Sequence, residues 1–520
     1  MKHESLQSLW YRAKPFALPA CLCLFAALCL TGLNPYFRPD YHDNITYFVA
    51  AESLLSGNGY TFQGAPIADW PPVTSLMLAG VFAISGPSIF IAKLTSLIAA
   101  IISILLAHRL LRNEQRADRL KTIVLFSLTP VALLTATTVA SDWICAALSF
   151  GCLLALGRMR EHRTVSLAVA TGLLLGLASL TRQTGVLLGA AIIAQAFLVI
   201  RGGNRLRTTW PELVAAAIGA TMYLSWGFYT AAQIAEHPPL TGNYANQGLA
   251  LFTDFSFTEL ALSIFDLFWK WDDVLAKAGV PTWFATTLLI IPSGILIVGA
   301  ITTLRSGRAH PSDYYALAFI ALIFGYHWKM GRYLLPIAPF LISWFFTGLR
   351  SISAAMATRG WLARPSPERL VATIAATWLA LLIPLNAYVL FNRTGNGAHR
   401  GISMLRNPLP SDYYQGHWAD LHAACEAIKQ DGRPGAVAGD GFYLRYIHVF
   451  SDRLASDIKR EPEVPADYVL FVAEEDSPLS TVFANGGHEK IFHSDHVTVF
   501  RRIESPSTQL SARQDPPDFP

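Results

Sequence analysis

Two aspartates, Asp43 and Asp142, stand where a carboxylate could act as a base at a membrane surface. Asp43 follows the first long apolar run and starts the stretch DNITYFVAAESLL. Asp142 separates two apolar runs in TTVASDWICAALSF. A lone carboxylate at a membrane boundary is costly unless it is paired, solvated or functional. Each aspartate also has a structural interpretation, because Asp is a preferred N-cap residue of helices.

Cationic side chains interrupt later apolar runs and would suit the recognition of a phosphate. Arg332 lies in GRYLLP and Arg182 in LTRQTG, and the fork of a guanidinium group can bind two phosphate oxygens. Lys329 and His327 precede Arg332 closely enough to assist it. The alternative for either arginine is that its aliphatic part lies in the apolar layer while its charge reaches the membrane surface.

Candidates for metal binding are few. His42 is an accessory candidate beside Asp43, with a solvated loop histidine as the alternative. Two carboxylates and a histidine can hold a divalent cation, but no spacing in this sequence fixes a metal. The sequence therefore predicts no certain cofactor and leaves a divalent cation open. The six cysteines form neither a CxxC metal spacing nor a disulfide pattern, so we interpret them as packing residues.

The composition places these side chains in a membrane protein. Of the 520 residues, 52% are hydrophobic and 15% are charged, and the mean hydropathy is +0.37. Soluble proteins carry roughly 25% charged residues. The net charge of +4 is spread over loops, which predicts an orientation in a bilayer and no nucleic-acid partner.

About eleven apolar runs are near the ~20 residues that cross ~30 Å of hydrocarbon. They cover residues 16–33, 88–108, 122–140, 143–157, 165–180, 184–200, 210–232, 283–304, 314–328, 333–349 and 370–390. A further stretch, PPVTSLMLAGVFAISG at 71–86, is ambiguous between a crossing and a juxtamembrane segment. The sequence thus predicts a polytopic helical protein with a long first loop that carries juxtamembrane helices.

Positive charges predict the orientation, because short loops rich in Lys and Arg stay in the cytoplasm. With residues 71–86 kept as a re-entrant or interfacial segment, the inner segments carry about 20 such residues and the outer segments about six. A crossing at 71–86 would reverse every later loop. We therefore predict a plasma (inner) membrane protein with a cytoplasmic N-terminus, an uncleaved first span and an outer first loop over 34–87.

The chain changes character after residue 390, where apolar runs of spanning length stop. The stretches GAVAGDGFYLRYIHVF, ADYVLFVAE and HVTVFRR are typical of short strands or buried runs between polar segments. The tail is poor in apolar residues and contains four prolines. We therefore predict a membrane domain over 1–390, a small outer (periplasmic) α/β domain over 391–505 and a disordered tail over 506–520.

Five motifs lie on segments that this topology places outside: DNITYFVAAESLLSGNGY, DWPPVTSL, ASDW, SLTRQTG and GRYLLPIAPF. Their order resembles that of membrane glycosyltransferases of the C-type fold, which include the protein O-mannosyltransferases and the lipid A aminoarabinose transferase. The resemblance covers roughly residues 15–350. Each motif alone is weak, and the specificity comes from their order and common side.

The resemblance implies that residues 1–390 transfer a sugar from a polyprenyl-phosphate donor to an envelope lipid, glycan or protein. Asp43 matches the catalytic acidic position of the family, Asp142 an acidic residue on the next outer turn, and Arg332 the arginine before a late helix. Two departures are Asn44, where a second acidic residue is usual, and Trp70, where some relatives place a phosphate-binding lysine. Both put the corresponding contacts in doubt.

A transporter or flippase of a lipid-linked or small polar substrate is the alternative, because transport pathways also use ionisable residues at membrane depth. The charged residues of this sequence gather on one predicted face and no inverted repeat is evident, which favours the enzyme. The sequence does not identify the sugar, the acceptor or the length of the lipid carrier, nor the oligomeric state.

Overall fold

The computed structural model describes most of the membrane part and the core of the C-terminal part. The described residues are 16–37, 43–68, 70–113, 116–201, 206–236, 282–306, 309–325, 331–359, 367–391, 414, 417–439, 443–457, 466–472 and 488–503. They divide into two compact units, which are described separately. The first holds most of the chain up to residue 392, and the second holds the described residues from Tyr414 onward together with the first turn of α3.

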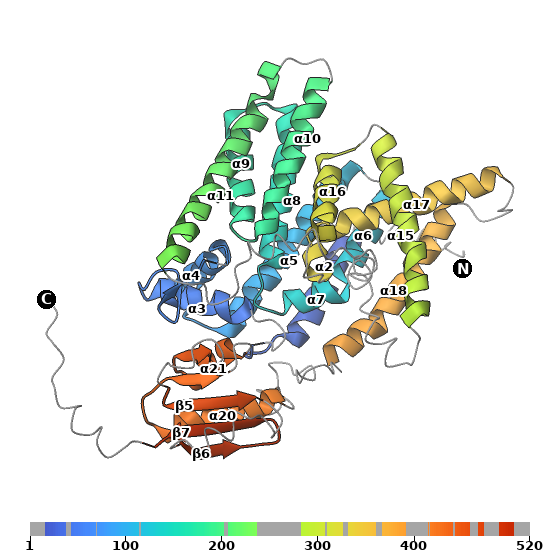
Figure 1. Ribbon diagram of the computed structural model, residues 1–520. Helices are drawn as coiled ribbons and strands as arrows, with labels where there is room; N and C mark the ends of the chain where they lie inside the picture. The colour runs from blue at the N-terminus through green and yellow to red at the C-terminus, as the bar shows by residue number, and fades with distance from the viewer. Residues whose placement is uncertain are drawn as a thin grey trace. The chain divides into compact units, whose positions relative to one another are not determined.

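The first unit is helical (Figure 1). Its α-helices are α2 Ala17–Gly32, α3 Asp43–Leu55, α4 Val73–Ser85, α5 Ile89–Leu110, α6 Arg116–Ser127, α7 Pro130–Ala136, α8 Asp142–Glu161, α9 Val165–Ser179, α10 Leu188–Arg201, α11 Trp210–Glu236, α15 Thr282–Arg305, α16 Pro311–Gly325, α17 Ala338–Thr358 and α18 Pro367–Phe391. Short 3-10 helices are η2 Leu111–Asn113, η3 Gln183–Leu187, η4 Leu206–Thr209 and η6 Gly331–Leu334.

Each apolar run predicted from the sequence falls on one of these helices or on a pair of them. Among the described residues, five helices are long and apolar enough to cross a membrane, or six if the bent pair α6–α7 counts as one span. The mostly helical architecture is thus confirmed, whereas the number of eleven spans stays a prediction. Helix α4 has 13 residues, so it covers about 20 Å at 1.5 Å per residue and is too short to span alone.

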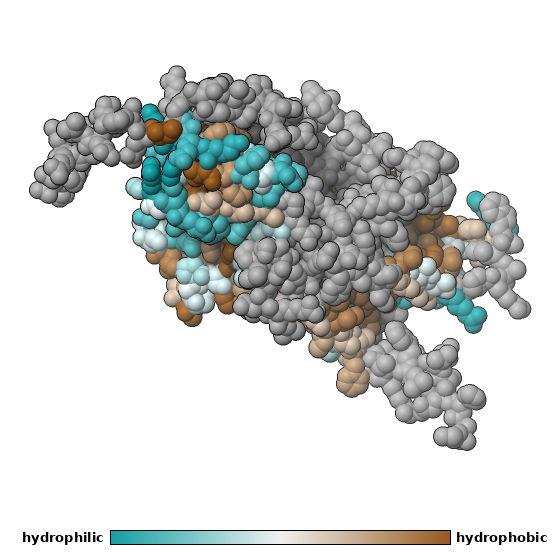
Figure 2. All heavy atoms as spheres, turned by 90° about the horizontal axis from the view of Figure 1, so that it is seen from below, coloured by the Kyte–Doolittle hydropathy of each residue, from teal (hydrophilic) through white to brown (hydrophobic). Residues whose placement is uncertain are grey.

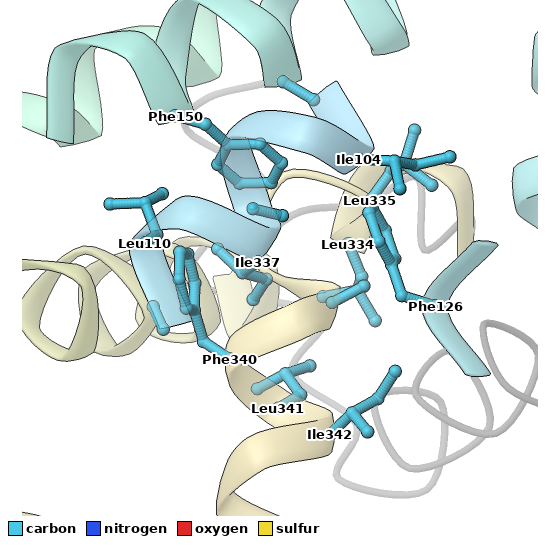
Figure 3. Packing of buried hydrophobic residues seen from close by; sticks show 14 of the residues in the cluster. Ile104, Leu110, Phe126, Phe150, Leu334, Leu335, Ile337, Phe340, Leu341 and Ile342 are labelled. Atoms are coloured by element: carbon cyan, nitrogen blue, oxygen red, sulfur yellow. The ribbon is translucent and has the colours of Figure 1, made fainter. Parts of the chain in front are cut away.

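A continuous apolar core joins these helices. Figure 3 shows Ile104 of α5, Phe126 of α6, Phe150 of α8 and Phe340 of α17 in one cluster with Leu334 of η6. The aromatic rings meet edge to face, with 6.5 Å between the centroids of Phe126 and Phe150 and 5.8 Å between those of Phe150 and Phe340. This cluster therefore packs segments that are far apart in the sequence against η6, which carries Arg332.

Helices α6 and α7 form one broken path, bent by 55°. Pro130 opens α7, where its missing N–H needs no partner, and the Thr129 side chain accepts the N–H of Ala132 at 3.3 Å. The carbonyl of Leu128 accepts a hydrogen bond at 2.6 Å from the buried Asn386 of α18. After this break, α7 and the buried residues Thr137 and Thr138 lead to the turn that carries Asp142.

The first loop folds as two short helices around a small hairpin. Strands β1 (Thr61–Phe62) and β2 (Ala65–Pro66) pair antiparallel between α3 and α4. The hydroxyl of Tyr60 donates to the Trp70 carbonyl at 3.0 Å, and the Tyr60 ring lies 5.8 Å from that of Trp226 in α11. The side chain of Trp70 is buried.

The second unit contains a five-stranded sheet in the order β4-β3-β5-β7-β6. The strands are β3 Val437–Gly439, β4 Ala455–Asp457, β5 Tyr468–Val472, β6 His488–His493 and β7 Val497–Arg502, and the helices are α20 His417–Asp431 and α21 Leu444–Ser451. Strands β4, β3 and β5 run parallel, and β7 pairs antiparallel with β5 and β6. The stretch GAVAGDGFYLRYIHVF thus supplies a strand and a helix, because YLRYIHVF presents its apolar residues at helical spacing.

The two units differ in surface. Large apolar side chains are exposed along the helices of the first unit, among them Phe197, Phe228 and Ile291. In the described part of the second unit the exposed large apolar residues are Leu454 and Ile503. Figure 2 shows hydrophilic residues gathered in one area, with some hydrophobic residues among them, and further hydrophobic residues in other parts of the view. An apolar exterior suits helices that face lipid.

Candidate functional site

Asp142 is the first residue of α8, and only 2% of its side chain is exposed. The N-cap position belongs to Ser141, whose side chain makes no capping hydrogen bond. The capping role that the sequence offered as the alternative for Asp142 therefore does not occur. A carboxylate in the first turn is favoured by the positive end of the helix dipole.

Arg182 pairs with Asp142 from the turn between α9 and η3. Its guanidinium Nη1 lies 2.5 Å from Asp142 Oδ1 and donates to the Ser141 hydroxyl at 3.4 Å. Both side chains are mostly buried, so this is a charge-assisted pair in a poorly solvated place. The second carboxylate oxygen, Asp142 Oδ2, is buried and has no hydrogen-bond partner among the described residues. Such an atom costs free energy unless another group satisfies it.

Tyr333 of η6 lies between the two predicted cations. The Cζ atom of Arg182 is 4.8 Å from the centroid of the Tyr333 ring, and that of Arg332 is 5.4 Å away. The two guanidinium groups repel each other electrostatically. Asp142 is thus a charged partner of Arg182, and the second arginine lies on the same tyrosine ring.

Asp43 is the first residue of α3 and is half-buried. Residues four apart share one face of a helix, so Asp43 and Tyr47 lie on the same side of α3. The Tyr47 hydroxyl donates to the Ser141 hydroxyl at 3.1 Å. Through Tyr47 the first loop thus reaches the turn that carries Asp142.

The structure brings Asp142, Arg182 and Arg332 together from three segments. His42, Lys329 and His327 lie outside the described residues. Sequence reasoning missed Tyr47, Ser141 and Tyr333, although each stands within a quoted motif. The described part of the chain contains no group of three or more His, Cys, Asp or Glu side chains that could hold a metal ion.

Known proteins resemble this chain in part of its sequence and in its fold. Residues 69–228 match the model of the family "Dolichyl-phosphate-mannose-protein mannosyltransferase". No curated protein matches the chain in sequence.

Two solved structures share the fold over nearly the whole chain. ArnT from Cupriavidus metallidurans bound to undecaprenyl phosphate is 14% identical with a TM-score of 0.59, covering 94% of this chain and 98% of its own. The Archaeoglobus fulgidus oligosaccharyltransferase tethered to an acceptor peptide is 12% identical with a TM-score of 0.54, covering 95% of this chain and 75% of its own. The mannosyltransferase match over residues 69–228 and the shared fold confirm the resemblance seen in the motifs, and the chain has the fold of these two solved structures.

Proposed function

We propose that this protein transfers a sugar from a polyprenyl-phosphate donor to an envelope lipid, glycan or protein on the outer face of the inner membrane. In this proposal Asp43 is the general base, Arg332 binds the donor phosphate, and Asp142 is a second acidic residue held by Arg182. One similar structure holds undecaprenyl phosphate, which supports the donor class. The proposal keeps residues 34–87 and the second unit on the outer side.

The reaction needs a base for the acceptor and a stabiliser for the leaving group. The carboxylate of Asp43 takes the proton from the acceptor hydroxyl or amine as that group attacks the anomeric carbon of the sugar. The bond between this carbon and the phosphate oxygen breaks, and its electrons leave with the polyprenyl phosphate. Arg332 then faces an anion whose charge has grown, so its interaction is strongest late in the reaction.

The observation that carries the proposal is a buried carboxylate oxygen of Asp142 close to two arginines. Asp142 lies 2.5 Å from Arg182, and Arg332 contacts the same Tyr333 ring as Arg182. We assign the donor phosphate to Arg332, because its guanidinium fork can bind two phosphate oxygens, and Arg182 is the partner that orients Asp142. Asp142 Oδ2, buried and unpartnered among the described residues, is the oxygen available to accept a hydrogen bond from a substrate.

The test is release of free polyprenyl phosphate from a sugar-loaded carrier by the purified full-length protein in detergent. We expect Asp43→Asn to lower turnover about 10²–10⁴-fold, because the amide keeps the size of the side chain and cannot accept the proton. Donor binding, measured by titration of the unloaded carrier, stays within about twofold, because Asp43 does not hold the phosphate. The control is Lys121→Met on α6, which should leave turnover per folded molecule unchanged.

Two outcomes would overturn parts of this proposal. If wild-type protein releases no carrier phosphate with envelope-derived acceptors, the transporter reading replaces the enzyme, since detergent removes the two compartments that transport needs. If Asp43→Asn retains near-normal turnover, the base lies elsewhere and Asp142 becomes the next candidate.

A further inference from the structure

A lysine that no motif includes lies buried at one end of a membrane helix. Lys93 of α5 is only 1% exposed. Its ammonium Nζ donates to Asn34 Oδ1 at 2.8 Å and to the Tyr36 carbonyl at 2.6 Å. A buried ammonium group loses several kcal/mol of hydration unless hydrogen bonds replace it, so these contacts hold the chain firmly. The segment that they hold is the start of the first loop.

Asn34, which accepts from Lys93, also makes the hydrogen bonds of a turn at the end of α2. Its Oδ1 also accepts the backbone N–H of Tyr36 at 3.1 Å, and its Nδ2 donates to the Gly32 carbonyl at 3.3 Å. Asn34 thereby closes the turn that ends α2, which is the usual role of an Asn side chain in a turn. Lys93 binds two oxygens of this turn, so it fixes the point at which the chain leaves α2.

Aromatic contacts carry that constraint from the turn to α3. Phe37 is buried and meets Phe48 of α3 edge to face, with 5.3 Å between centroids. Phe48 in turn meets Phe82 of α4 at 5.1 Å. Lys93 is therefore linked to α3 in two steps. The first is the polar contact between Lys93 and Asn34, which we call the clamp, and the second is the packing of Phe37, Phe48 and Phe82.

The same helix also holds the turn that leads to Asp142. One turn along from Lys93, the Ser96 hydroxyl oxygen accepts the backbone N–H of Ala140 at 3.4 Å. Ser103 donates to the Trp143 carbonyl at 3.0 Å. Helix α5 thus contacts both the start of the first loop and the turn that leads to Asp142. The hydrogen bond from Tyr47 to Ser141 is a second link between the first loop and that turn.

We infer that Lys93 is a positioning residue, which clamps the start of the first loop to α5 and so fixes α3 relative to the Asp142 turn. This inference rests on the proposed function for its catalytic meaning. A misplacement of about 1 Å in a reacting group can cost about 10²-fold in rate. The lysine side chain therefore acts on turnover without contact to the substrate.

The first experiment measures catalysis by the full-length Lys93→Met variant, which keeps the length of the side chain and removes the ammonium donors. We expect kcat for carrier release to fall about 10- to 100-fold while KM for the donor stays within about twofold. Lys93→Arg, which keeps donors at the same place, should recover much of the rate. The matched control is Thr95→Val on the same turn of α5, because the Thr95 hydroxyl bonds only locally, to the Ile91 carbonyl at 2.9 Å.

A double-mutant cycle tests the clamp itself. Asn34→Ala and Lys93→Met remove the two sides of one contact, so their effects on kcat should be strongly non-additive. Additive losses would mean that the two residues act independently and would overturn the clamp.

The second measurement does not depend on any donor. Hydrogen exchange of peptides from α3, followed by mass spectrometry, should be about tenfold faster in Lys93→Met than in the wild type or in Thr95→Val, while peptides from α9 stay unchanged. If the wild type releases no carrier phosphate, the proposed function fails and this exchange measurement still decides whether the clamp exists. Unchanged exchange in α3, or faster exchange without loss of kcat, would overturn the inference.

Discussion

Two buried aspartates of the helical unit, Asp118 and Asp142, both pair with arginine. They differ in how many of their carboxylate oxygens have a partner. Asp118 of α6 uses both oxygens, since Oδ1 accepts from Lys121 at 3.2 Å and Oδ2 from Arg350 of α17. Asp142 uses only Oδ1, for Arg182. Its Oδ2 is buried and unsatisfied within the described chain.

We propose that this difference separates a structural ion pair, that of Asp118, from a functional one, that of Asp142. Both carboxylate oxygens of Asp118 have a cationic partner, and both partners are about one-quarter exposed. The Asp142 cluster is deeper and incomplete, and a second arginine faces the same tyrosine ring. Buried groups that lack partners point to sites where a substrate supplies them.

Within this comparison, the largest effect is expected at Asp142, whose second carboxylate oxygen lacks a partner in the described chain. Asp142→Asn keeps an oxygen for Arg182 and removes the negative charge, so we expect kcat for carrier release to fall about 10- to 100-fold, the range of one hydrogen bond to a charged group. Steady-state release by purified protein measures it. Full activity in Asp142→Asn would abolish the distinction between the two aspartates.

Arg332 should show a smaller effect when its charge is kept. Arg332→Lys loses the fork but retains the cation, so we expect kcat to fall about tenfold with little change in donor affinity. Arg332→Ala should impair both quantities. Parallel variants of Arg182 provide the comparison, because Arg182→Lys keeps the pairing with Asp142. Equal sensitivity of both arginines in donor binding would contradict the assignment of the phosphate to Arg332 alone.

The saturated aspartate should affect stability instead of turnover. Asp118→Asn removes the negative charge with which both Lys121 and Arg350 pair, and we expect the free energy of unfolding to fall by about 1–2 kcal/mol, since both cations retain contact with water. Thermal unfolding measures this loss, and carrier release per folded molecule should stay unchanged. A drop in kcat at constant stability would place Asp118 among the functional residues.

The smallest expected effect is on the stability of the second unit, and it comes from two partly buried histidines. In the second unit, burial lowers the pKa of His422, and burial also lowers the pKa of His448. An unfolded histidine binds a proton near pH 6.5 while these folded ones resist it, so the unit should lose stability as the pH falls below about 6.5.

Hydrogen exchange of α20 peptides between pH 7.5 and 5.5, corrected for intrinsic rates, checks this pH dependence. His422→Phe should weaken it, because a phenyl ring keeps the contacts that His422 makes with Tyr414 and Phe450. An α20 that is equally protected at both pH values would show that these histidines do not control the unit.

The helices and part of the site were predictable from the sequence for different reasons. Helices were predictable because long apolar runs must satisfy their backbone internally in lipid. Asp142, Arg182 and Arg332 were identifiable because a charge between apolar runs is costly and therefore conspicuous. Tyr47, Ser141 and Tyr333 gave no such signal, since tyrosine and serine are inexpensive at almost any membrane boundary.

The sequence by itself determined the helical membrane architecture, the family resemblance and three of the charged residues now found together. The tertiary structure alone decided which charges pair. Arg182 and Arg332 look alike as arginines beside apolar runs, yet only Arg182 lies within 2.5 Å of Asp142. Lys93 lies in a helix with no motif, and its role depends on Asn34, 59 positions away. Local pattern encodes the cost of burying a charge, whereas the partner that offsets this cost comes from a distant segment and is fixed only by packing.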